Sequence, residues 1–577
     1  MPLRTLLLTP LALATVGFVP AAAPVAPPPR PVTDWPMFGG TPSRNMVNPH
    51  DALPPLPRNA PDAADLANAW EPWLRWKADL GTHTYAGPVV AGGRVYVGTN
   101  NQRPRNKRDT RRTDDGEDEP LDKGVLMCFD APTGAFLWQA ATDTIPPFGL
   151  SDWPRVGACS VPTVVGDRVY HVNNLCRVVC LDAKGFADGN QGMQAEKYRD
   201  PTDADVLWEY DMLRELGVAP HNNVSNGSPL VIGDLLYTVT GNGVDEGHFN
   251  VRAPNAPSLV CLNRHTGRLV WSDNSPGRDI LHGQWSSPAY AAGPVPQVVF
   301  GGGDGWLRGF DPPTGRLLWK FDGNPKDGVY ELGGAGTKSE FVGCPVVWEG
   351  RVYVGVGQDP EHTDGIGRFW CVDLAKAVAG GAADPARDVS PELVVRADKD
   401  ANGRPRVVTR PNPASAAAWT YGGEEKRRWS VTDFRFGRTM STACVVDGVL
   451  YVPELPGHLH CLDARTGKHF WRYDTKTPVW GSCYAVDGKV LLGNDNGDLY
   501  VFRHDPRPAV LDELADTENV PTVQAARRIR WKVRAEIEQR FLHAKIEFDA
   551  PIRTTPAVAG GVLYVVAEKT LFAFGPR

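Results

Sequence analysis

Two acidic segments that contain histidine are the parts of this sequence whose residue types best suit metal binding. GNGVDEGH holds Asp245, Glu246 and His248. GQDPEHTDG holds the candidate metal ligands Asp359, Glu361, His362 and Asp364. Oxygen-rich loops of this kind bind calcium, although neither segment keeps the spacing of a known calcium loop. The alternative for both segments is a solvated, sharply turned loop.

Other reactive patterns are few. HLHC places His458 and His460 on one face of a strand beside Cys461, which is either a metal pair without an evident third ligand or ordinary strand packing. The chain has no Gly-x-Ser-x-Gly elbow, no phosphate-binding loop and no His-Glu-x-x-His motif. Hydrolase and kinase chemistry therefore have no support in the sequence.

The elements that must position these residues are repeated hairpins. A β-branched run, a two-residue turn and a second β run recur along the chain, and Gly or Asp at the turn tolerates the positive φ that tight hairpins require. The copies are VVAGGRVYVG (89–98), VVGDRVYHV (164–172), LVIGDLLYTV (230–239), VVWEGRVYVG (346–355), VVDGVLYV (445–452), AVDGKVLLG (485–493) and VAGGVLYVV (558–566), with a longer-turned eighth at 289–302.

A third strand follows each hairpin, and in the clearest copies a Thr-Gly turn and a tryptophan come next. These copies are FDAPTGAFLW, LNRHTGRLVW, FDPPTGRLLW and LDARTGKHFW, which end at Trp138, Trp271, Trp319 and Trp471, while Trp208 and Trp419 follow longer turns. Four strands repeated eight times predict an all-β fold, an eight-bladed β-propeller. We expect the tryptophans to be wedges between blades.

The chain ends predict how the ring closes. The last repeat, from Thr554 to Gly575, has three strands, and PWLRWKADLG (72–81), which precedes the first hairpin, supplies the missing fourth. Pairing of the N- and C-terminal strands in one sheet would remove a free edge.

The LD..TG...W block after a DG.VY.G hairpin resembles the repeat of pyrroloquinoline-quinone (PQQ) dehydrogenases and of the propeller lipoprotein that helps to assemble outer-membrane β-barrels. DWPMFGG, LHGQWSSPA, GGGDGWL, GQDPEHTDG and RPNPASAAAWTYGG further resemble a family of exported PQQ-repeat proteins common in planctomycete bacteria. The resemblance covers nearly the whole mature chain. A repeat of this type implies the fold and does not prove that the quinone is bound.

The resemblance to PQQ dehydrogenases implies a calcium ion held by Glu, Asn and Asp beside the quinone, an Asp base, a Trp floor and often a disulfide of adjacent cysteines. Asn226 with Glu340 matches part of that calcium clamp, whereas no Asp base is matched and no Cys-Cys pair exists. The ten cysteines mostly occupy repeat positions. We expect small buried thiols, because equivalent positions in successive blades lie too far apart for a bridge.

The first strands of a propeller line its axis, so the residues before each hairpin should face the central channel or its mouth. Alignment on the Pro or Cys of each copy gives one ring: Tyr85, Cys159, Asn226, Trp285, Val342, Ser441, Trp480 and Arg553. The neighbouring turns add Arg155, His282, Gln284, Glu340 and Arg438. We predict that a polar, flat or anionic ligand binds at Tyr85, Arg155, Asn226, Trp285, Glu340, Arg438, Trp480 and Arg553. A hydrated plug is the alternative.

Composition limits the classes of partner. The 577 residues are 42% hydrophobic and 22% charged, which excludes a disordered chain. Lys+Arg 61 against Asp+Glu 67 gives a net charge of −6, which argues against a nucleic-acid partner.

The N-terminus predicts export. Residues 1–26 carry an early Arg4, an apolar stretch from Leu6 to Val19 and small residues at 21–23, as in a secretory signal peptide. A transmembrane anchor is the alternative, but the stretch is short and Pro10 interrupts it. We expect an exported protein of the periplasm or cell envelope with no transmembrane segment in the mature chain.

The remaining chain divides into a lead-in and a propeller. Residues 27–69 are a Pro-rich lead-in that we expect to wrap the folded body. Residues 70–577 form the propeller, with insertions at 103–123, 375–415 and 521–548. In the last insertion, Pro521 and Thr522 could start a helix with Val533, Ile537 and Phe541 on one face.

Two functions of different class follow. The first is binding, either as a scaffold for envelope proteins or as a receptor for a small polar ligand at the central channel. The second is catalysis, as a PQQ- and calcium-dependent dehydrogenase of alcohols or sugars.

Overall fold

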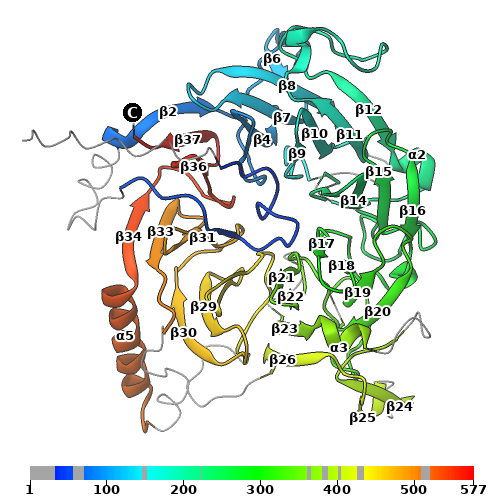
Figure 1. Ribbon diagram of the computed structural model, residues 1–577, viewed down its shortest axis with the longest axis vertical. Helices are drawn as coiled ribbons and strands as arrows, with labels where there is room; N and C mark the ends of the chain where they lie inside the picture. The colour runs from blue at the N-terminus through cyan, green and yellow to red at the C-terminus, as the bar shows by residue number, and fades with distance from the viewer. Residues whose placement is uncertain are drawn as a thin grey trace, which may run out of the picture. The chain divides into compact units, whose positions relative to one another are not determined.

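The computed structural model describes residues 33–55, 71–145, 153–222, 224–225, 227–334, 336–359, 361, 365–379, 387–399, 405–424, 434–507 and 520–576. The predicted signal peptide and residues 27–32 and 56–69 of the lead-in therefore lie outside the described residues. Thr33–Arg577 is one compact unit. Within it, eight antiparallel sheets are arranged as blades around a central axis (Figure 1), so the eight-bladed propeller is confirmed.

The first four blades follow one another along the chain. Blade 1 contains β3 (Val89–Ala91), β4 (Arg94–Asn100), β7 (Lys123–Asp130) and β8 (Phe136–Asp143). Blade 2 contains β9 (Thr163–Val165), β10 (Arg168–Val172), β11 (Arg177–Asp182) and β12 (Val206–Asp211). Blade 3 contains β13 (Leu230–Ile232), β14 (Leu235–Val239), β15 (Leu259–Asn263) and β16 (Leu269–Asp273). Blade 4 contains β17 (Ala289–Ala291), β18 (Gln297–Gly301), β19 (Trp306–Phe310) and β20 (Leu317–Asp322).

The other four blades complete the ring. Blade 5 contains β21 (Val346–Trp348), β22 (Arg351–Val356), β23 (Arg368–Asp373) and β26 (Ala417–Gly422). Blade 6 contains β27 (Cys444–Val446), β28 (Val449–Pro453), β29 (His458–Asp463) and β30 (His469–Asp474). Blade 7 contains β31 (Tyr484–Val486), β32 (Lys489–Gly493), β33 (Asp498–Arg503) and β34 (Leu542–Glu547). Blade 8 contains β35 (Ala557–Ala559), β36 (Val562–Ala567), β37 (Thr570–Phe574) and β2 (Leu74–Asp79).

The two ends of the chain meet in blade 8. β2 pairs antiparallel with β37, from Leu74 opposite Phe574 to Asp79 opposite Thr570. The last repeat thus obtains its fourth strand from the segment before the first hairpin, as predicted. This pairing leaves no exposed edge between the first and last blades.

The hairpin turns have the backbone conformation that their residues predict. Both central residues have positive φ in Gly92-Gly93, Glu349-Gly350, Asp447-Gly448, Asp487-Gly488 and Gly560-Gly561. Two consecutive positive φ angles define the tight turn whose twist matches that of antiparallel strands. The repeated Gly and Asp therefore fix each hairpin locally.

The repeated tryptophans pack between blades, as predicted. Trp208 at the outer strand of blade 2 donates its indole N–H to the carbonyl of Arg264 in blade 3 at 3.1 Å, and its ring covers Gly267 of the same turn. Four other tryptophans donate their indole N–H to a backbone carbonyl of the next blade in the same way: Trp76 to Ala131, Trp138 to Ala183, Trp271 to Pro312 and Trp419 to Ala464. A Cβ at Gly134, Gly267, Gly315 or Gly467 would lie 2.5 to 2.7 Å from the facing indole. The Thr-Gly turn therefore needs glycine to seat the tryptophan of the preceding blade.

The cysteines at the third strands belong to the same arrangement. In five blades a tyrosine of the second strand, a cysteine of the third and a tryptophan of the fourth lie opposite one another, as in Tyr237, Cys261 and Trp271. Burial raises the pKa of the Cys180, Cys261 and Cys371 thiols to about 12. All ten cysteines are free thiols. Those of the third strands are small buried side chains between a tyrosine ring and a tryptophan ring.

Two first-strand cysteines at non-equivalent positions lie close together without forming a bridge. Cys444 of blade 6 and Cys483 before blade 7 bring their Sγ atoms within 3.4 Å. They approach because their positions are not equivalent: Cys444 begins its strand, whereas Cys483 precedes its strand by one residue.

The described part of the lead-in, Thr33–Pro55, lies at the axis of the ring; we call it the axial segment (Figure 1). It bonds to the first strand of almost every blade through backbone or side chain. These contacts are Trp35 with Val90, Pro36 with Val164, Pro42 with Tyr290, Ser43 with Val347, Asn45 with Val445, Met46 with Ala485 and Asn48 with Val558. Part of it, β1 (Val47–Asn48), pairs parallel with β31. The Pro-rich composition predicts a segment that wraps the folded body and does not reveal this position at the axis, because the contacts are single bonds to distant strands.

Blade 3 is missing from these contacts, and there the axial segment contributes the side chain of Arg44. Its guanidinium is fully buried and donates to the carbonyl oxygens of Phe38, Ser228, Pro229 and Pro288 at 2.8 to 3.0 Å. Burial lowers its pKa to about 10, so it stays charged at neutral pH. Four carbonyl acceptors thus replace the water that a buried cation loses.

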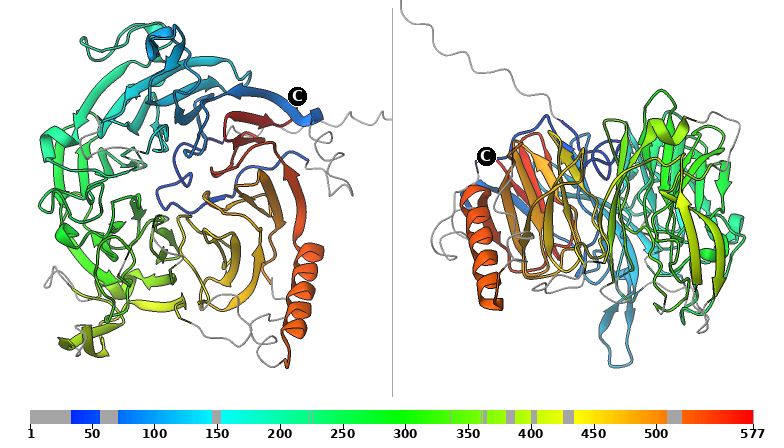
Figure 2. Two further views of the ribbon diagram at one scale, coloured as in Figure 1. Left: turned by 180° about the vertical axis from the view of Figure 1, so that it is seen from behind. Right: turned by 90° about the horizontal axis from the view of Figure 1, so that it is seen from below.

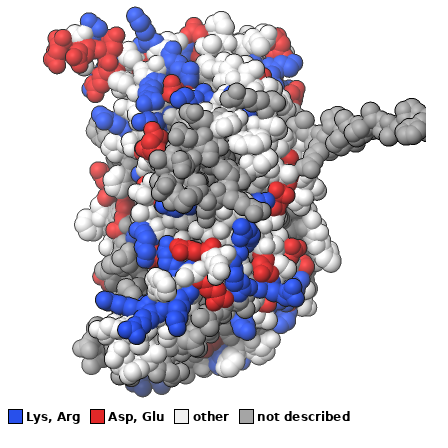
Figure 3. All heavy atoms as spheres, turned by 90° about the vertical axis from the view of Figure 1, so that its left-hand side faces the viewer, with Lys and Arg blue, Asp and Glu red and all other residues white. Residues whose placement is uncertain are grey.

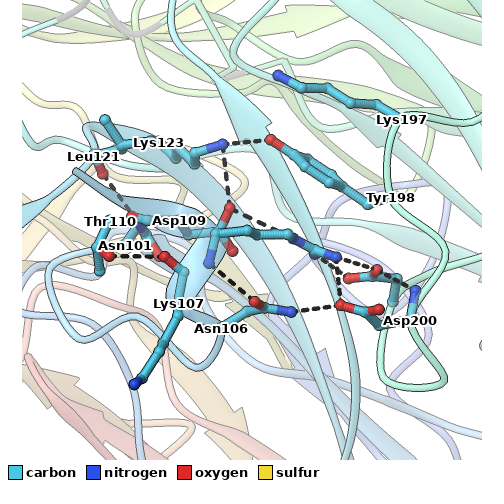
Figure 4. A network of polar contacts seen from close by, with 12 residues as sticks. Asn101, Asn106, Lys107, Asp109, Thr110, Leu121, Lys123, Lys197, Tyr198 and Asp200 are labelled. Atoms are coloured by element: carbon cyan, nitrogen blue, oxygen red, sulfur yellow. Dashed lines mark hydrogen bonds and ion pairs between the residues drawn. The ribbon is translucent and has the colours of Figure 1, made fainter. Parts of the chain in front are cut away.

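The first insertion forms a hairpin. β5 (Thr110–Arg112) and β6 (Asp118–Pro120) bring basic residues opposite acidic ones, as in Arg111 with Glu119. Below the hairpin, the buried Lys123 contacts Asp109 and Tyr198 (Figure 4). Lys123 also contacts Asp143. The hairpin projects from one face of the ring (Figure 2).

The other insertions elaborate the outside. The second contributes α3 (Leu374–Val378) and the hairpin of β24 (Glu392–Lys399) and β25 (Pro405–Pro411). The third contains α5 (Val523–Arg540), which is capped by Thr522 and buries Val533 and Ile537, with Phe541 buried directly after it. The predicted helix is confirmed, whereas the rest of that insertion is the outer strand β34. The remaining short elements are α2 (Met212–Leu216) and the 3-10 turns Glu71–Trp73, Lys107–Asp109, Gly185–Asp188 and Gly277–Asp279.

No helix in the described part of the chain is both long and apolar enough to cross a membrane.

We predict that Gly267→Ala destabilises the ring more than Gly233→Ala does. Both glycines lie in blade 3 with positive φ, 68° and 56°, but Gly233 has open space where Gly267 meets Trp208. The overpacking should cost about 1–3 kcal/mol beyond the shared backbone cost. Thermal unfolding of the two variants measures the difference, and equal melting temperatures would contradict the role given to the indole.

We predict that Arg44→Met lowers the melting temperature and exposes the axial segment to protease. The change removes the Arg44 donor from four carbonyl oxygens, of which that of Pro229 keeps a second donor in Thr163 Oγ1, at about 1–3 kcal/mol for each buried acceptor that finds no substitute. Thermal unfolding and limited proteolysis within residues 33–55 measure the two effects. An unchanged melting temperature with an uncut segment would show that the ring holds this segment without Arg44.

Candidate functional site

A cavity of about 470 Å³ lies at the axis. One ring of its wall comes from the residue four positions before the first strand of a blade; these residues are Tyr85, Cys159, Trp285, Val342, Met440, Trp480 and Arg553. The equivalent residue of blade 3, Asn226, lies outside the described residues. We call this space the axial cavity.

One member of the predicted ring is replaced. Met440 lines the cavity, while the predicted Ser441 is buried and donates its Oγ to the carbonyl of Gly481 at 2.8 Å. The alignment is one residue off in blade 6, because Ala443 stands where most blades have proline and Cys444 begins the strand.

The axial segment contributes to the other end of the cavity. Phe38 joins a deeper layer of residues that lie two positions before the first strands, namely Val161, Ser228, Ser287, Cys344 and Thr442. The carbonyl of Phe38 accepts a bond from Arg44 at 2.8 Å. The buried arginine therefore holds the residue that narrows this end.

The predicted binding residues separate into two groups. Tyr85, Arg155, Trp285, Trp480 and Arg553 line the cavity together. Glu340 and Arg438 do not: Glu340 is buried beside Asp359, and Arg438 donates to the carbonyl of Asp359 at 2.9 Å.

The two cations of the cavity differ in their partners. Arg553 bonds to Asp495 and Glu568, each at 2.7 Å, so its charge is compensated. Arg155 is exposed, and no described residue pairs with its guanidinium. Its backbone is fixed at a positive φ of 64°, with its N–H donating to Asp122 at 2.9 Å. Arg155 thus offers a cation beside the aromatic wall.

A second feature adjoins this wall. The side chains of His221, His248, His282 and Glu361 converge, with every potential ligand atom within 4.8 Å of the others. His221 Nε2 lies 3.0 Å from His248 Nε2, and Glu361 Oε2 lies 3.2 Å from His248 Nε2 and 3.1 Å from His282 Nε2. We call these four residues the histidine cluster. His282 and Glu361 also line the axial cavity.

Three loops bring the histidines together. His221 follows α2 between blades 2 and 3, His248 lies between β14 and β15, and His282 lies between blades 3 and 4. Backbone bonds join the loops: Gly243 N–H to the Ala219 carbonyl at 3.0 Å, and Val244 N–H to the His282 carbonyl at 2.9 Å.

Gly243 permits this close approach. A Cβ there would lie 2.4 Å from the carbonyl oxygen of His282 and 3.4 Å from the Cβ of His221. Any larger residue would therefore push the loops apart and separate the imidazoles.

The fourth member comes from blade 5. Glu361 lies between β22 and β23, and its Oε1 accepts a bond from Asn222 at 3.0 Å. Asn222 and His248 both have positive φ, 43° and 55°, which costs free energy in residues other than glycine. Such strain is typical of functional loops.

The ionisation of the cluster follows from its surroundings. Burial and the neighbouring His282 and His248 lower the pKa of His221 to about 4. The hydrogen bond from His282 lowers the pKa of Glu361. Behind them, burial and the adjacent Asp359 raise the pKa of Glu340 well above its usual value. At neutral pH His221 is a neutral imidazole and Glu361 a carboxylate.

The predicted metal loop is only partly described. Glu361 points into the histidine cluster, and Asp359 is buried, where it accepts a bond from the Glu361 N–H at 2.8 Å and contacts Glu340. His362 and Asp364 lie outside the described residues. The calcium site at these four residues stays a prediction.

Of the two interpretations given for the HLHC segment, the contacts of its histidines favour strand packing. His458 Nδ1 lies 2.6 Å and His460 Nε2 3.4 Å from the two oxygens of the buried Glu454. His460 also contacts the hydroxyl of Tyr421 at 3.1 Å.

Sequence reasoning noticed His248 and His282 separately and missed His221. The three histidines and Glu361 share no motif, since they span 140 residues and reach one another only through the loops of successive blades. The sole local signal is the Asp and Gly content of the turns around them.

The matched family follows from the repeats. A model of the family described as "Outer membrane protein assembly factor BamB" matches residues 73–378 and 407–507, which is more than half of the chain. The chain belongs to this family. The members share PQQ-like propeller repeats; the match omits residues 379–406 of the second insertion and ends at residue 507, after β33 of blade 7.

Two curated relatives match short stretches. The quinohemoprotein alcohol dehydrogenase of Comamonas testosteroni is 32% identical over 105 residues, 18% of this chain and 13% of that protein. The outer membrane protein assembly factor BamB of Nitrosomonas eutropha is 39% identical over 56 residues, 10% of this chain and 14% of that protein. The chain therefore matches only a small part of the length of each relative.

Solved structures show the same fold. A europium-containing methanol dehydrogenase is 13% identical with a TM-score of 0.52, covering 94% of this chain and 98% of that one. The quinohemoprotein alcohol dehydrogenase from Comamonas testosteroni has the same identity and TM-score, covering 94% of this chain and 80% of that one. At this identity the likeness concerns the fold alone.

Proposed function

We propose that the protein is a binding protein of the cell envelope whose axial cavity takes a small, flat ligand that carries an anionic group. The carrying observation is an aromatic wall, Tyr85, Trp285 and Trp480, beside Arg155, whose guanidinium pairs with no described residue, in a cavity of about 470 Å³. That volume is ordinary for small-molecule sites, and aromatic rings with a few polar groups are their usual lining.

The geometry favours a ligand receptor over a scaffold for envelope proteins. A scaffold needs an outer surface, whereas the distinctive residues lie inside the ring. The face of the molecule in Figure 3 has Lys and Arg interspersed with Asp and Glu, which supports the expectation that no nucleic acid is bound. The envelope location is supported by the predicted signal peptide.

A calcium-bound quinone does not fit the residues at the axis. Calcium takes six to eight oxygen ligands, whereas the described donors beside the cavity are the two carboxylates of Asp359 and Glu361 and the imidazoles of the histidine cluster. Glu340, which the family resemblance places in the calcium clamp, does not line the cavity, and burial beside Asp359 raises its pKa well above the usual value, which disfavours the charged form that a calcium ligand needs. We derive no quinone chemistry from this site.

We predict that small aromatic carboxylates bind the cavity and that Arg155→Ala weakens them about tenfold or more, because a hydrogen bond to a charged group contributes about 1.5–3 kcal/mol. A panel of benzoate and phthalate, with benzamide as the uncharged comparison, is titrated by calorimetry and tryptophan fluorescence. Arg268→Ala, which removes an exposed arginine of the blade 3 turn, is the control. Equal affinities of the native protein and Arg155→Ala for the carboxylates, or equal affinities for benzamide and the carboxylates, would overturn the proposal.

We also predict that the full-length protein mixed with calcium and PQQ gains no quinone absorbance and reduces no dye with alcohols. The donor set at the axis gives the physical reason. Visible absorbance after desalting, followed by a dye-reduction assay, makes the measurement. Retained quinone with alcohol-dependent dye reduction would establish the alternative function, a PQQ-dependent dehydrogenase.

A further inference from the structure

We propose that the histidine cluster binds one divalent first-row transition-metal ion, of which zinc is the type, through Nε2 of His221, His248 and His282 and the carboxylate of Glu361. The binding residues come from the loops of blades 2 to 5.

The geometry is close to that of a coordinated ion. Zinc lies about 2.0–2.1 Å from imidazole nitrogen and about 2.0–2.2 Å from carboxylate oxygen, so tetrahedral ligand atoms are about 3.3 Å apart. Three of the six pairs of ligand atoms lie 3.0, 3.1 and 3.2 Å apart, and all six pairs lie within 4.8 Å. Small side-chain rotations are enough to admit an ion at their centre.

Hydrogen bonds alone explain the arrangement less well. His248 Nε2 lies 3.0 Å from His221 Nε2 and 3.2 Å from Glu361 Oε2. A neutral imidazole carries at most one proton on this nitrogen, and that proton would have to serve both contacts. If the proton is on His221 instead, the lone pair of His248 faces a carboxylate. A cation between the four atoms removes this conflict.

The donor types select the class of metal. Three imidazole nitrogens suit zinc, copper, nickel, cobalt or iron, whereas calcium and magnesium prefer sets of oxygen atoms. One carboxylate leaves a bound divalent ion with a net positive charge.

The surroundings hold the ligands as supporting residues do at metal sites. Asn222 donates to the oxygen of Glu361 that is turned away from His248 and His282. The ring of Trp285 packs against His282 with 4.6 Å between centroids. Contacts that orient the metal-binding side chains in this way raise the affinity for the metal.

A metal here would also act on the axial cavity. His282 and Glu361 belong to its wall, so the net positive charge would add to that of Arg155. This step alone rests on the proposed function, because it concerns the anionic ligand; metal binding itself does not.

The experiment uses the full-length protein, stripped with chelator and reloaded with zinc or cobalt(II). We expect one zinc per chain by elemental analysis after desalting, and visible cobalt bands of a nitrogen-rich site. His248→Ala and Glu361→Gln should each weaken zinc binding about tenfold or more by calorimetry. His265→Ala, which removes an exposed histidine from the blade 3 turn, should bind zinc like the native protein. His248 and Glu361 are only partly buried, so these variants should fold, which thermal unfolding checks.

The outcomes are distinct. Absence of bound zinc in the native protein, or equal affinities of His248→Ala and His265→Ala, would overturn the metal site. No organic ligand enters these titrations, and Arg155→Ala should bind zinc normally. Failure of the aromatic carboxylates to bind would therefore leave this inference intact, and failure of zinc would leave the cavity proposal intact.

Discussion

The packing of an indole ring on a side-chain-free glycine of the next blade is the contact on which the ring depends. A four-stranded blade cannot bury both its faces alone, so each must be covered by a neighbour. The glycine lets the indole approach, its turn supplies the carbonyl that the indole N–H requires, and a cysteine opposite the tryptophan leaves room for the ring. Where an insertion replaces the turn, the tryptophan uses other partners: Trp319 bonds to Gln297 and Trp471 stacks on Phe541.

Closing eight blades into a ring creates an axis that must be filled or used. The axial segment fills one part, with Arg44 satisfying carbonyls that face the centre. The remaining space becomes the axial cavity. Loops at its wall are longer than the hairpin turns, and there the histidines gather. The architecture thus separates stability, in the blades, from chemistry, in the loops before and between the strands.

Features encoded by neighbouring residues could be predicted from the sequence. The hairpins follow from residues that accept positive φ, the wedges follow from the Thr-Gly spacing, and α5 follows from the four-residue spacing of Val533, Ile537 and Phe541. Closure by β2 followed from counting strands. Among the described residues, the ring of cavity residues was placed correctly where proline or Cys483 directly precedes the strand, and shifted by one in blade 6, where Ala443 takes that place and Cys444 begins the strand.

The unpredicted features are those formed by single contacts between distant residues. His221 carries no signal that it meets Glu361, because the meeting depends on the angle between blades and on Gly243. Arg44 looks like any arginine of a polar turn, and its burial arises only once strands from several blades surround it. The local sequence therefore does not predict contacts between residues that lie far apart along the chain.

The axial segment has a consequence for the order in which the molecule is made. Asn48 is synthesised early, yet its partner Val558 lies 510 residues further along the chain. Loop closure over such a separation is entropically costly and slow, so the segment docks after the last blade has emerged from the ribosome. Until then the cavity wall also lacks Trp480 and Arg553, which precede the last two blades. The axial cavity is therefore completed in the final step of folding, and only a chain translated to its last blade can possess it.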